Sequence, residues 1–198
     1  MKNWKQIPIP PKMVGLEKDP RGFPIPFIVL RDPNGKTYFQ VNDSVKVAQC
    51  INERLCAICG QPLGTDAWLA GGPLSAFHPQ GAYIDTPTHH DCGNYAMRVC
   101  PFLAITTYNG KFNADKLAAE GWAGVTVDPT VIGDRPPFFA YVKIRGFTVN
   151  PVSKYLTPKK PLLAVEYWNA GEQISKEDAQ ALFDKQYWRT EHFGIAVY

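Results

Sequence analysis

The sequence predicts an α+β fold in a single domain with β-hairpins and short helices. Two observations lead to this prediction. Short β-branched and aromatic runs, typical of strands, are interleaved with segments of helical periodicity, and the length of 198 residues suits one domain. Hydrophobic residues make up 45% of the chain and charged residues 20%, which is a globular composition and excludes a disordered chain.

The first 26 residues are rich in proline, which fixes φ and removes backbone donors. We therefore expect residues 1–26 to form an extended arm that lies over the body without regular structure. The single α+β domain is expected to occupy residues 27–198. The six prolines that define the arm are Pro8, Pro10, Pro11, Pro20, Pro24 and Pro26.

A hairpin and a helix are predicted to follow the arm. Strands at 27–30 and 37–41 flank the turn signal Asp32-Pro33-Asn34-Gly35. Asp43 or Ser44 can cap a helix that runs to about Arg54. Its apolar stripe is predicted at three- and four-residue spacing, comprising Val45, Ala48, Ile51 and Leu55.

Further along the chain, residues 60–87 are rich in glycine and proline and predict short strands and loops. A helix is expected from His89 to about Met97, ended or kinked by Pro101. The remaining elements are a short helix at 114–120 capped by Asn113, strands at 138–147 and 161–168, a turn at 169–171, and a helix from the capping box at Ser175 to about Trp188.

The sharpest signal is Cys56-Ala57-Ile58-Cys59-Gly60 followed by His89-His90-Asp91-Cys92. The first pair forms a tight knuckle that presents two thiolates to one ion. His89 and Cys92 are three residues apart at a helix start, so they share one face. Together Cys56, Cys59, His89 and Cys92 match the closed tetrahedral shell of structural zinc. The order of knuckle, insertion and helix is similar to a treble clef, with the zinc-binding centre at about 43–103.

Other histidines and cysteines are weaker candidates for the zinc site. His90 should face away from Cys92, and His78 is a remote alternative. Cys50 and Cys100 lie outside the ligand spacing and are expected to be reduced thiols in the core. An odd number of cysteines, five, excludes complete disulfide pairing. No apolar stretch follows the first residues and no apolar run reaches about 18 residues, so we expect neither a signal peptide nor membrane association, and a cytoplasmic location.

The sequence favours no catalytic site, and no catalytic residue is assigned. A zinc deaminase would place His-x-Glu before its Cys-x-x-Cys pair, and this order is absent from the sequence. A nuclease of the His-Asn-His type needs a further histidine and ligands for a hydrolytic metal. Its candidates here are His78, Asp85, His90 and Asn94, without the Asp-His pair that the class requires.

Two features leave nucleic-acid or ligand binding open. Aromatic and cationic residues at 139, 141, 143, 145 and 147 alternate onto one strand face, which suits single-stranded nucleic acid. The alternative is a half-buried sheet with cations reaching solvent. The pair Gly71-Gly72 could bring backbone close to a ligand or form a turn. The net charge of +3 is spread evenly and selects no partner.

Several motifs carry a resemblance to a set of uncharacterised proteins of bacteria and their phages. These are the segments 21–27, 55–64 and 72–76, the pair His89 and Cys92, Cys100-Pro101-Phe102-Leu103, and the region from Val165 to Ala181. The resemblance implies that the Cys/His cluster belongs to the design of that family, and it implies no activity.

These observations together predict a zinc-stabilised, non-enzymatic binding protein of phage or bacterial origin. We expect it to act on a protein partner such as a host or defence factor. Two alternatives stay open, a nucleic-acid-binding zinc protein and a metal-dependent nuclease of the His-Asn-His type.

Overall fold

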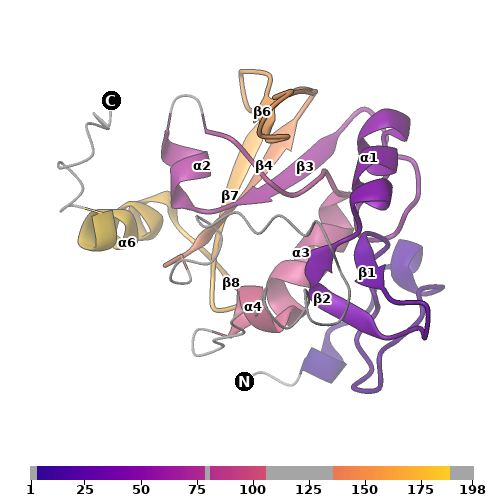
Figure 1. Ribbon diagram of the computed structural model, residues 1–198. Helices are drawn as coiled ribbons and strands as arrows, with labels where there is room; N and C mark the ends of the chain where they lie inside the picture. The colour runs from indigo at the N-terminus through magenta and orange to yellow at the C-terminus, as the bar shows by residue number, and fades with distance from the viewer. Residues whose placement is uncertain (1–3, 79–80, 106–135, 188–198) are drawn as a thin grey trace, which may run out of the picture.

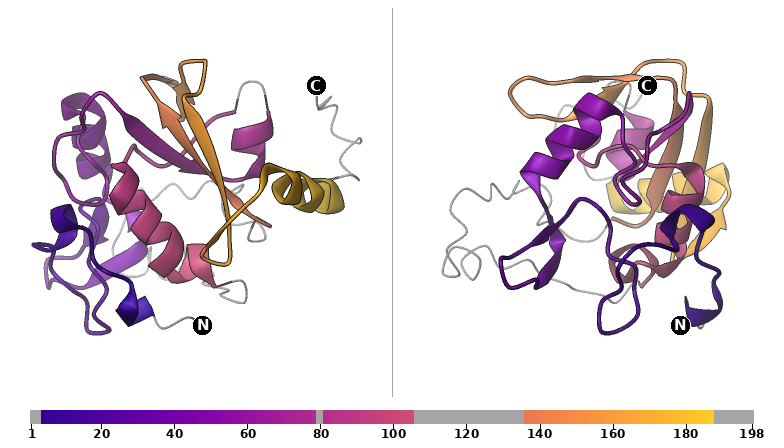
Figure 2. Two further views of the ribbon diagram at one scale, coloured as in Figure 1. Left: turned by 180° about the vertical axis from the view of Figure 1, so that it is seen from behind. Right: turned by 90° about the vertical axis from the view of Figure 1, so that its right-hand side faces the viewer.

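The structure, a computed structural model, describes residues 4–78, 81–105 and 136–187. Mixed helices and strands confirm the predicted α+β class (Figure 1). The N-terminal arm, the first hairpin and α1 gather at one end of the molecule, and α6 lies at the opposite end (Figure 2). The helix predicted at 114–120, the end of the last helix at Trp188 and His192 lie outside the described residues.

A four-stranded antiparallel sheet forms the centre, in the order β3-β4-β7-β8. Its strands are β3 (Ala67–Gly71), β4 (Phe139–Ile144), β7 (Ala164–Asn169) and β8 (Glu172–Ile174). The strand predicted at 138–147 is divided: β4 ends at Ile144, and β5 (Phe147–Val149) pairs instead with β6 (Leu156–Pro158). The predicted turn joins β7 to β8, with Ala170 and Gly171 at φ of 52° and 78°.

The two faces of this sheet are covered by different elements. Helix α3 (His90–Val99) and the short α4 (Pro101–Ala104) lie on one face, where the buried cluster comprises Trp68, Met97, Phe139, Tyr141 and Trp168. Apolar side chains on the other face include Leu69, Tyr83, Val142, Ile144 and Leu156. The sheet therefore provides a fixed platform beneath the start of α3, where the second half of the predicted zinc motif lies.

The first hairpin forms as predicted and is joined to the cysteine segment. β1 (Val29–Arg31) pairs with β2 (Thr37–Asn42), and the Asp32 carboxylate accepts two amide hydrogen bonds in the turn. β1 starts later than predicted because the amides of Phe27 and Ile28 donate instead to the carbonyls of Ile58 and Ala57, at 2.8 and 3.1 Å. These two bonds tie the hairpin to the knuckle.

Helix α1 (Ser44–Glu53) has the predicted cap but buries a different face. Val45 is 75% exposed and Ala48 is also exposed, so the predicted stripe is wrong at these positions. The packed side chains are Val47, Cys50 and Ile51. These residues also follow helical spacing, and only the packing against the hairpin and the sheet distinguishes the two faces.

The cap that Asp43 provides at the start of α1 should stabilise the protein. The Asp43 carboxylate accepts from the amides of Val45 and Lys46 at 2.9 and 3.3 Å. Asp43→Ala leaves these donors without their acceptor and should lower the free energy of unfolding by about 1 kcal/mol. Urea denaturation followed by circular dichroism measures the change. Ser44→Ala, at the exposed neighbour, is the control, and equal stability of the two variants would contradict the cap.

The N-terminal arm packs against the cysteine region. It contains two 3₁₀ turns, η1 (Trp4–Gln6) and η2 (Pro11–Met13), in a segment expected to lack regular structure. Met13 and Phe23 are buried in one cluster with Cys56 and Cys92. Trp4 stacks on Phe23 with ring centroids 4.0 Å apart. The arm therefore forms one wall of the candidate metal centre.

The glycine pair at 71 and 72 serves packing and the start of a helix. A Cβ at Gly71 would lie 2.7 Å from the Tyr83 ring, so the close approach of that ring requires glycine. Gly72 precedes the short α2 (Pro73–Phe77), a helix that the sequence did not predict.

At the other end of the fold, α6 (Lys176–Tyr187) follows Ser175, whose hydroxyl accepts from the Asp178 amide at 3.0 Å.

Candidate metal centre

The side chains of Cys56, Cys59, His89 and Cys92 lie together. Their ligand atoms are all within 4.8 Å of one another, a grouping that could hold a metal ion. Two of the side chains come from the loop between α1 and β3, and two come from the start of α3. Two pairs of residues that are 30 or more positions apart in the chain therefore meet at one point, because the hairpin, the knuckle and α3 pack together.

The knuckle is shaped by backbone hydrogen bonds and one glycine. Leu55 forms an antiparallel bridge with Pro62, and the Gly60 amide donates to the Cys56 carbonyl at 2.8 Å. Gly60 has φ of +70°, and a Cβ there would lie 2.9 Å from the Phe27 ring. Only glycine satisfies both the backbone conformation and the packing at this position. The turn consequently directs the side chains of Cys56 and Cys59 to the same side.

The start of α3 supplies the second pair. The His89 amide donates to Cys56 Sγ at 3.3 Å, and His89 Nδ1 lies 3.3 Å from Cys59 Sγ. On the other side of the ring, Nε2 lies 3.0 Å from the carbonyl oxygen of Pro62. A carbonyl can only accept, so Nε2 carries the hydrogen and Nδ1 presents its lone pair to the sulfurs. Histidines that ligate metals are commonly oriented in this way.

The three thiols are electrostatically linked. Hydrogen bonds from the thiols of Cys59 and Cys92, and then from backbone amides, hold the pKa of Cys56 well below its usual value. The same sharing with Cys56 raises the pKa of Cys59 and of Cys92. The hydrogen bonds from the two other thiols therefore favour the thiolate form of Cys56. A bound dication would favour three thiolates, with release of protons.

The donor set fits zinc. Tetrahedral zinc has Zn–S and Zn–N distances of about 2.3 and 2.0–2.1 Å, which place the ligand atoms roughly 3.5–3.8 Å apart. The 3.3 Å separation between Cys59 Sγ and His89 Nδ1 is close to this spacing. Cys56 and Cys92 are 0% exposed and His89 is 9% exposed, so the group is shielded from solvent. Three sulfurs and one nitrogen, with no carboxylate, match a structural zinc site.

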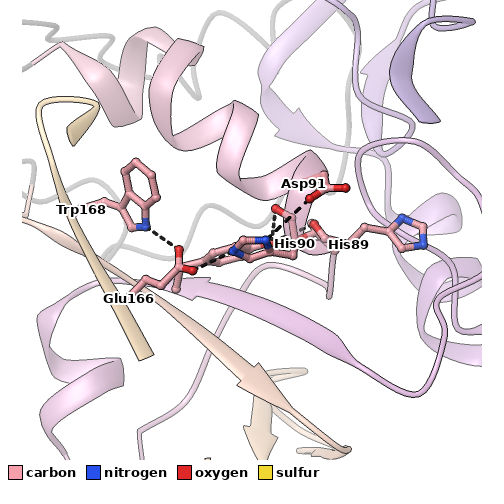
Figure 3. A network of polar contacts seen from close by, with 7 residues as sticks. His89, His90, Asp91, Glu166 and Trp168 are labelled. Atoms are coloured by element: carbon pink, nitrogen blue, oxygen red, sulfur yellow. Dashed lines mark hydrogen bonds and ion pairs between the residues drawn. The ribbon is translucent and has the colours of Figure 1, made fainter. Parts of the chain in front are cut away.

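His90 lies apart from this cluster. Its Nε2 is 2.7 Å from Glu166 Oε1, and Figure 3 shows its ring directed to Glu166 while the ring of His89 points the other way. Asp85, another candidate of the nuclease hypothesis, accepts from Asn42 Nδ2 at 3.3 Å. His78 is the C-cap of α2. His90 therefore pairs with a carboxylate of the sheet and not with the cysteine cluster.

Strand β4, which carries most of the alternating aromatic and cationic residues, is a half-buried part of the sheet. Phe139 is 6% exposed and Tyr141 is 0% exposed, so neither ring is available to stack on a base. Lys143 pairs with Asp66 at 2.6 Å. Arg145 lies beyond the end of β4 and is exposed. The structure therefore supports the interpretation of this face as a half-buried sheet and not as a binding face for single-stranded nucleic acid.

The two remaining cysteines lie outside the cluster. Cys50 is 1% exposed in a pocket of apolar side chains, and burial raises its pKa to about 11. Cys100 is the N-cap of α4, and burial also raises its pKa. Both therefore remain protonated thiols at neutral pH.

Tyr141 supports the centre from the sheet, which the sequence did not indicate. Its hydroxyl donates to the His89 carbonyl at 2.9 Å and lies 2.7 Å from Thr88 Oγ1. Gly93, in the first turns of α3, leaves room for this hydroxyl, because a Cβ there would lie 2.1 Å from it. The one signal in the sequence was a glycine inside a predicted helix, which often marks a close approach.

Comparisons with protein-family models, with curated proteins and with solved structures gave no match to this chain. Among the described residues, no helix is both long and apolar enough to cross a membrane.

Proposed function

We propose that the protein is a zinc-stabilised binding protein, without an enzymatic activity of its own, that acts on a protein partner. The observation that supports this proposal is the closed donor set of Cys56, Cys59, His89 and Cys92. A tetrahedral ion held by four protein ligands has no position left for water or substrate, whereas catalytic zinc keeps one open. The group is also shielded, with Cys56 and Cys92 fully buried.

In this proposal the zinc joins the N-terminal arm, the first hairpin and α3 at the point where they already pack together. Met13 and Phe23 of the arm pack around Cys56 and Cys92. The first hairpin bonds to the knuckle at Ala57 and Ile58. Helix α3 provides the remaining ligands and rests on the sheet. Zinc binding is worth about 10–16 kcal/mol in zinc-finger peptides, which is enough to determine whether such a region folds.

The burial of the aromatic residues on strand β4 favours a protein partner over nucleic acid. Binding of single strands needs exposed aromatic rings next to unpaired cations. Here Phe139 and Tyr141 are buried, and Lys143 is engaged with Asp66. Exposed apolar side chains occur instead at several positions, including Val14, Val152 and Val165.

A location and an origin are part of the proposal. Zinc thiolates require reduced cysteines, so a reducing compartment such as the cytoplasm suits the centre. Bacterial or phage origin, with a host or defence factor as partner, is the prediction made from the family resemblance.

Affinity capture separates the three functional hypotheses. The purified zinc-loaded protein is immobilised and exposed to a nuclease-treated bacterial lysate. We expect a reproducible protein partner that also binds in a purified mixture. Binding to single-stranded DNA that weakens steeply with salt would contradict the proposal in favour of a nucleic-acid-binding protein. Magnesium- or manganese-dependent DNA cleavage that is abolished by His90→Ala would contradict it in favour of a nuclease.

A further inference from the structure

His90 plays no part in the Cys/His cluster, yet its ring is held in one orientation. It packs on the Trp68 ring with centroids 4.4 Å apart and lies near Tyr141. Its Nε2 contacts Glu166 Oε1 at 2.7 Å. A surface histidine normally samples several rotamers. The contacts of this one remove that freedom before any ligand binds.

Glu166 is itself positioned by a second contact. Its other carboxylate oxygen accepts from Trp168 Nε1 at 3.1 Å, and the side chain is only 16% exposed (Figure 3). An ionised carboxylate accepts and does not donate, so Nε2 of His90 carries the hydrogen. The network directs Nε2 to Glu166 and leaves Nδ1 facing Asp91 as the ring nitrogen that can ligate a metal ion.

Nδ1 faces a second potential ligand. Asp91 Oδ1 lies 3.7 Å from it, and the side chains of His90 and Asp91 are 40% and 75% exposed. A metal ion about 2.0–2.2 Å from each atom would span this separation at a ligand–metal–ligand angle of roughly 120°. The two atoms can therefore share an ion with little movement, and solvent can fill its other positions.

The surrounding charges favour a cation. His90 is the first residue of α3, where the helix dipole disfavours positive charge. Asp91 and Glu166 bring two carboxylates to the same place. The cation on the neighbouring part of this sheet face, Lys143, is paired with Asp66 at 2.6 Å. Two carboxylates therefore flank the His90 ring, one at each nitrogen.

We propose that His90 and Asp91 form a second, solvent-open site for a divalent transition metal ion, with Glu166 as its positioning residue. A carboxylate on the far nitrogen of a ligating histidine is a recurring feature of metal sites and raises the basicity of the ligand. One imidazole and one carboxylate suit Zn²⁺, Co²⁺ or Ni²⁺. With only two protein ligands the ion exchanges readily, and its open positions accept oxygen ligands. This site does not depend on the function proposed above.

Calorimetric titration with Ni²⁺ tests the site. The full-length protein is first gel-filtered, and its zinc content is measured before and after the titration. We expect about one Ni²⁺ per chain at unchanged zinc content. His90→Ala should lose this binding, and Glu166→Gln should weaken it by about 10- to 100-fold. His78→Ala is the matched histidine control and should bind Ni²⁺ like the wild type.

Three results of this titration would overturn the proposal. These are the absence of Ni²⁺ binding by the zinc-loaded wild type, equal binding by His90→Ala, and loss of binding in His78→Ala alone. If His90→Ala also loses its zinc, the exposed substitution Asp91→Asn decides, and wild-type nickel affinity in that variant overturns the site. Because zinc content is measured separately, failure of the Cys/His centre is distinguished from failure of the second site.

Discussion

Cys92→Ser is expected to remove zinc and to unfold the region around the knuckle and the start of α3. Cys92 is 0% exposed and its sulfur is one of three in the cluster. A serine hydroxyl does not replace a thiolate ligand of zinc. Zinc binding contributes about 10–16 kcal/mol in zinc fingers, whereas whole domains are stable by about 5–15 kcal/mol. Thermal unfolding followed by circular dichroism, with zinc analysis, measures both effects.

The matched control is Cys50→Ser. Cys50 is as buried as Cys92, at 1% exposed, but lies outside the cluster. Its substitution should cost about 1–3 kcal/mol for a buried hydroxyl and leave the zinc content unchanged. Cys56→Ser should behave like Cys92→Ser. Equal zinc content and equal melting temperature in Cys92→Ser and the wild type would show that the cluster holds no structural metal.

Gly93→Ala is expected to destabilise the protein by about 3 kcal/mol or more, the upper end for overpacked cores. In an isolated helix this change would stabilise by about 1 kcal/mol. Here the new Cβ would lie 2.1 Å from the Tyr141 hydroxyl and 2.4 Å from its Cζ. Tyr141 is fully buried and bonded to the His89 carbonyl, so the ring or the start of α3 has to move. Urea unfolding of the zinc-loaded protein measures the loss.

Two further variants make the Gly93 experiment specific. Gly64→Ala is the control, because nothing lies within 4 Å of a Cβ there, and we expect it to be close to neutral. Tyr141→Phe combined with Gly93→Ala removes the nearest atom and should restore part of the stability relative to the sum of the single changes. A Gly93→Ala protein as stable as the wild type would refute the role of this contact.

Local signals account for the elements that sequence analysis predicted well. The first hairpin depends on the turn around Asn34-Gly35, and α1 begins at its Asp43 cap. The two halves of the Cys/His motif each lie within four or five residues, so spacing alone brought them into one hypothesis. Each of these features is determined by a few residues that are neighbours in the sequence.

The parts that were missed depend on packing between distant residues. The buried face of α1 is chosen by the hairpin and the sheet, and β8 spans only three residues beside β7. Glu166 meets His90 because β7 pairs with β4 opposite Tyr141, on which α3 rests. The two residues are 76 positions apart, and neither has a motif that predicts the other.

X-ray absorption at the zinc edge, on gel-filtered protein with about one zinc per chain, identifies the atoms that bind the metal. We expect a shell of three sulfurs at about 2.3 Å and one nitrogen at about 2.0–2.1 Å. This result would assign the ion to Cys56, Cys59, His89 and Cys92, whose donor atoms lie within 4.8 Å of one another. A shell of nitrogen and oxygen alone, or a folded protein that purifies without metal, would contradict it.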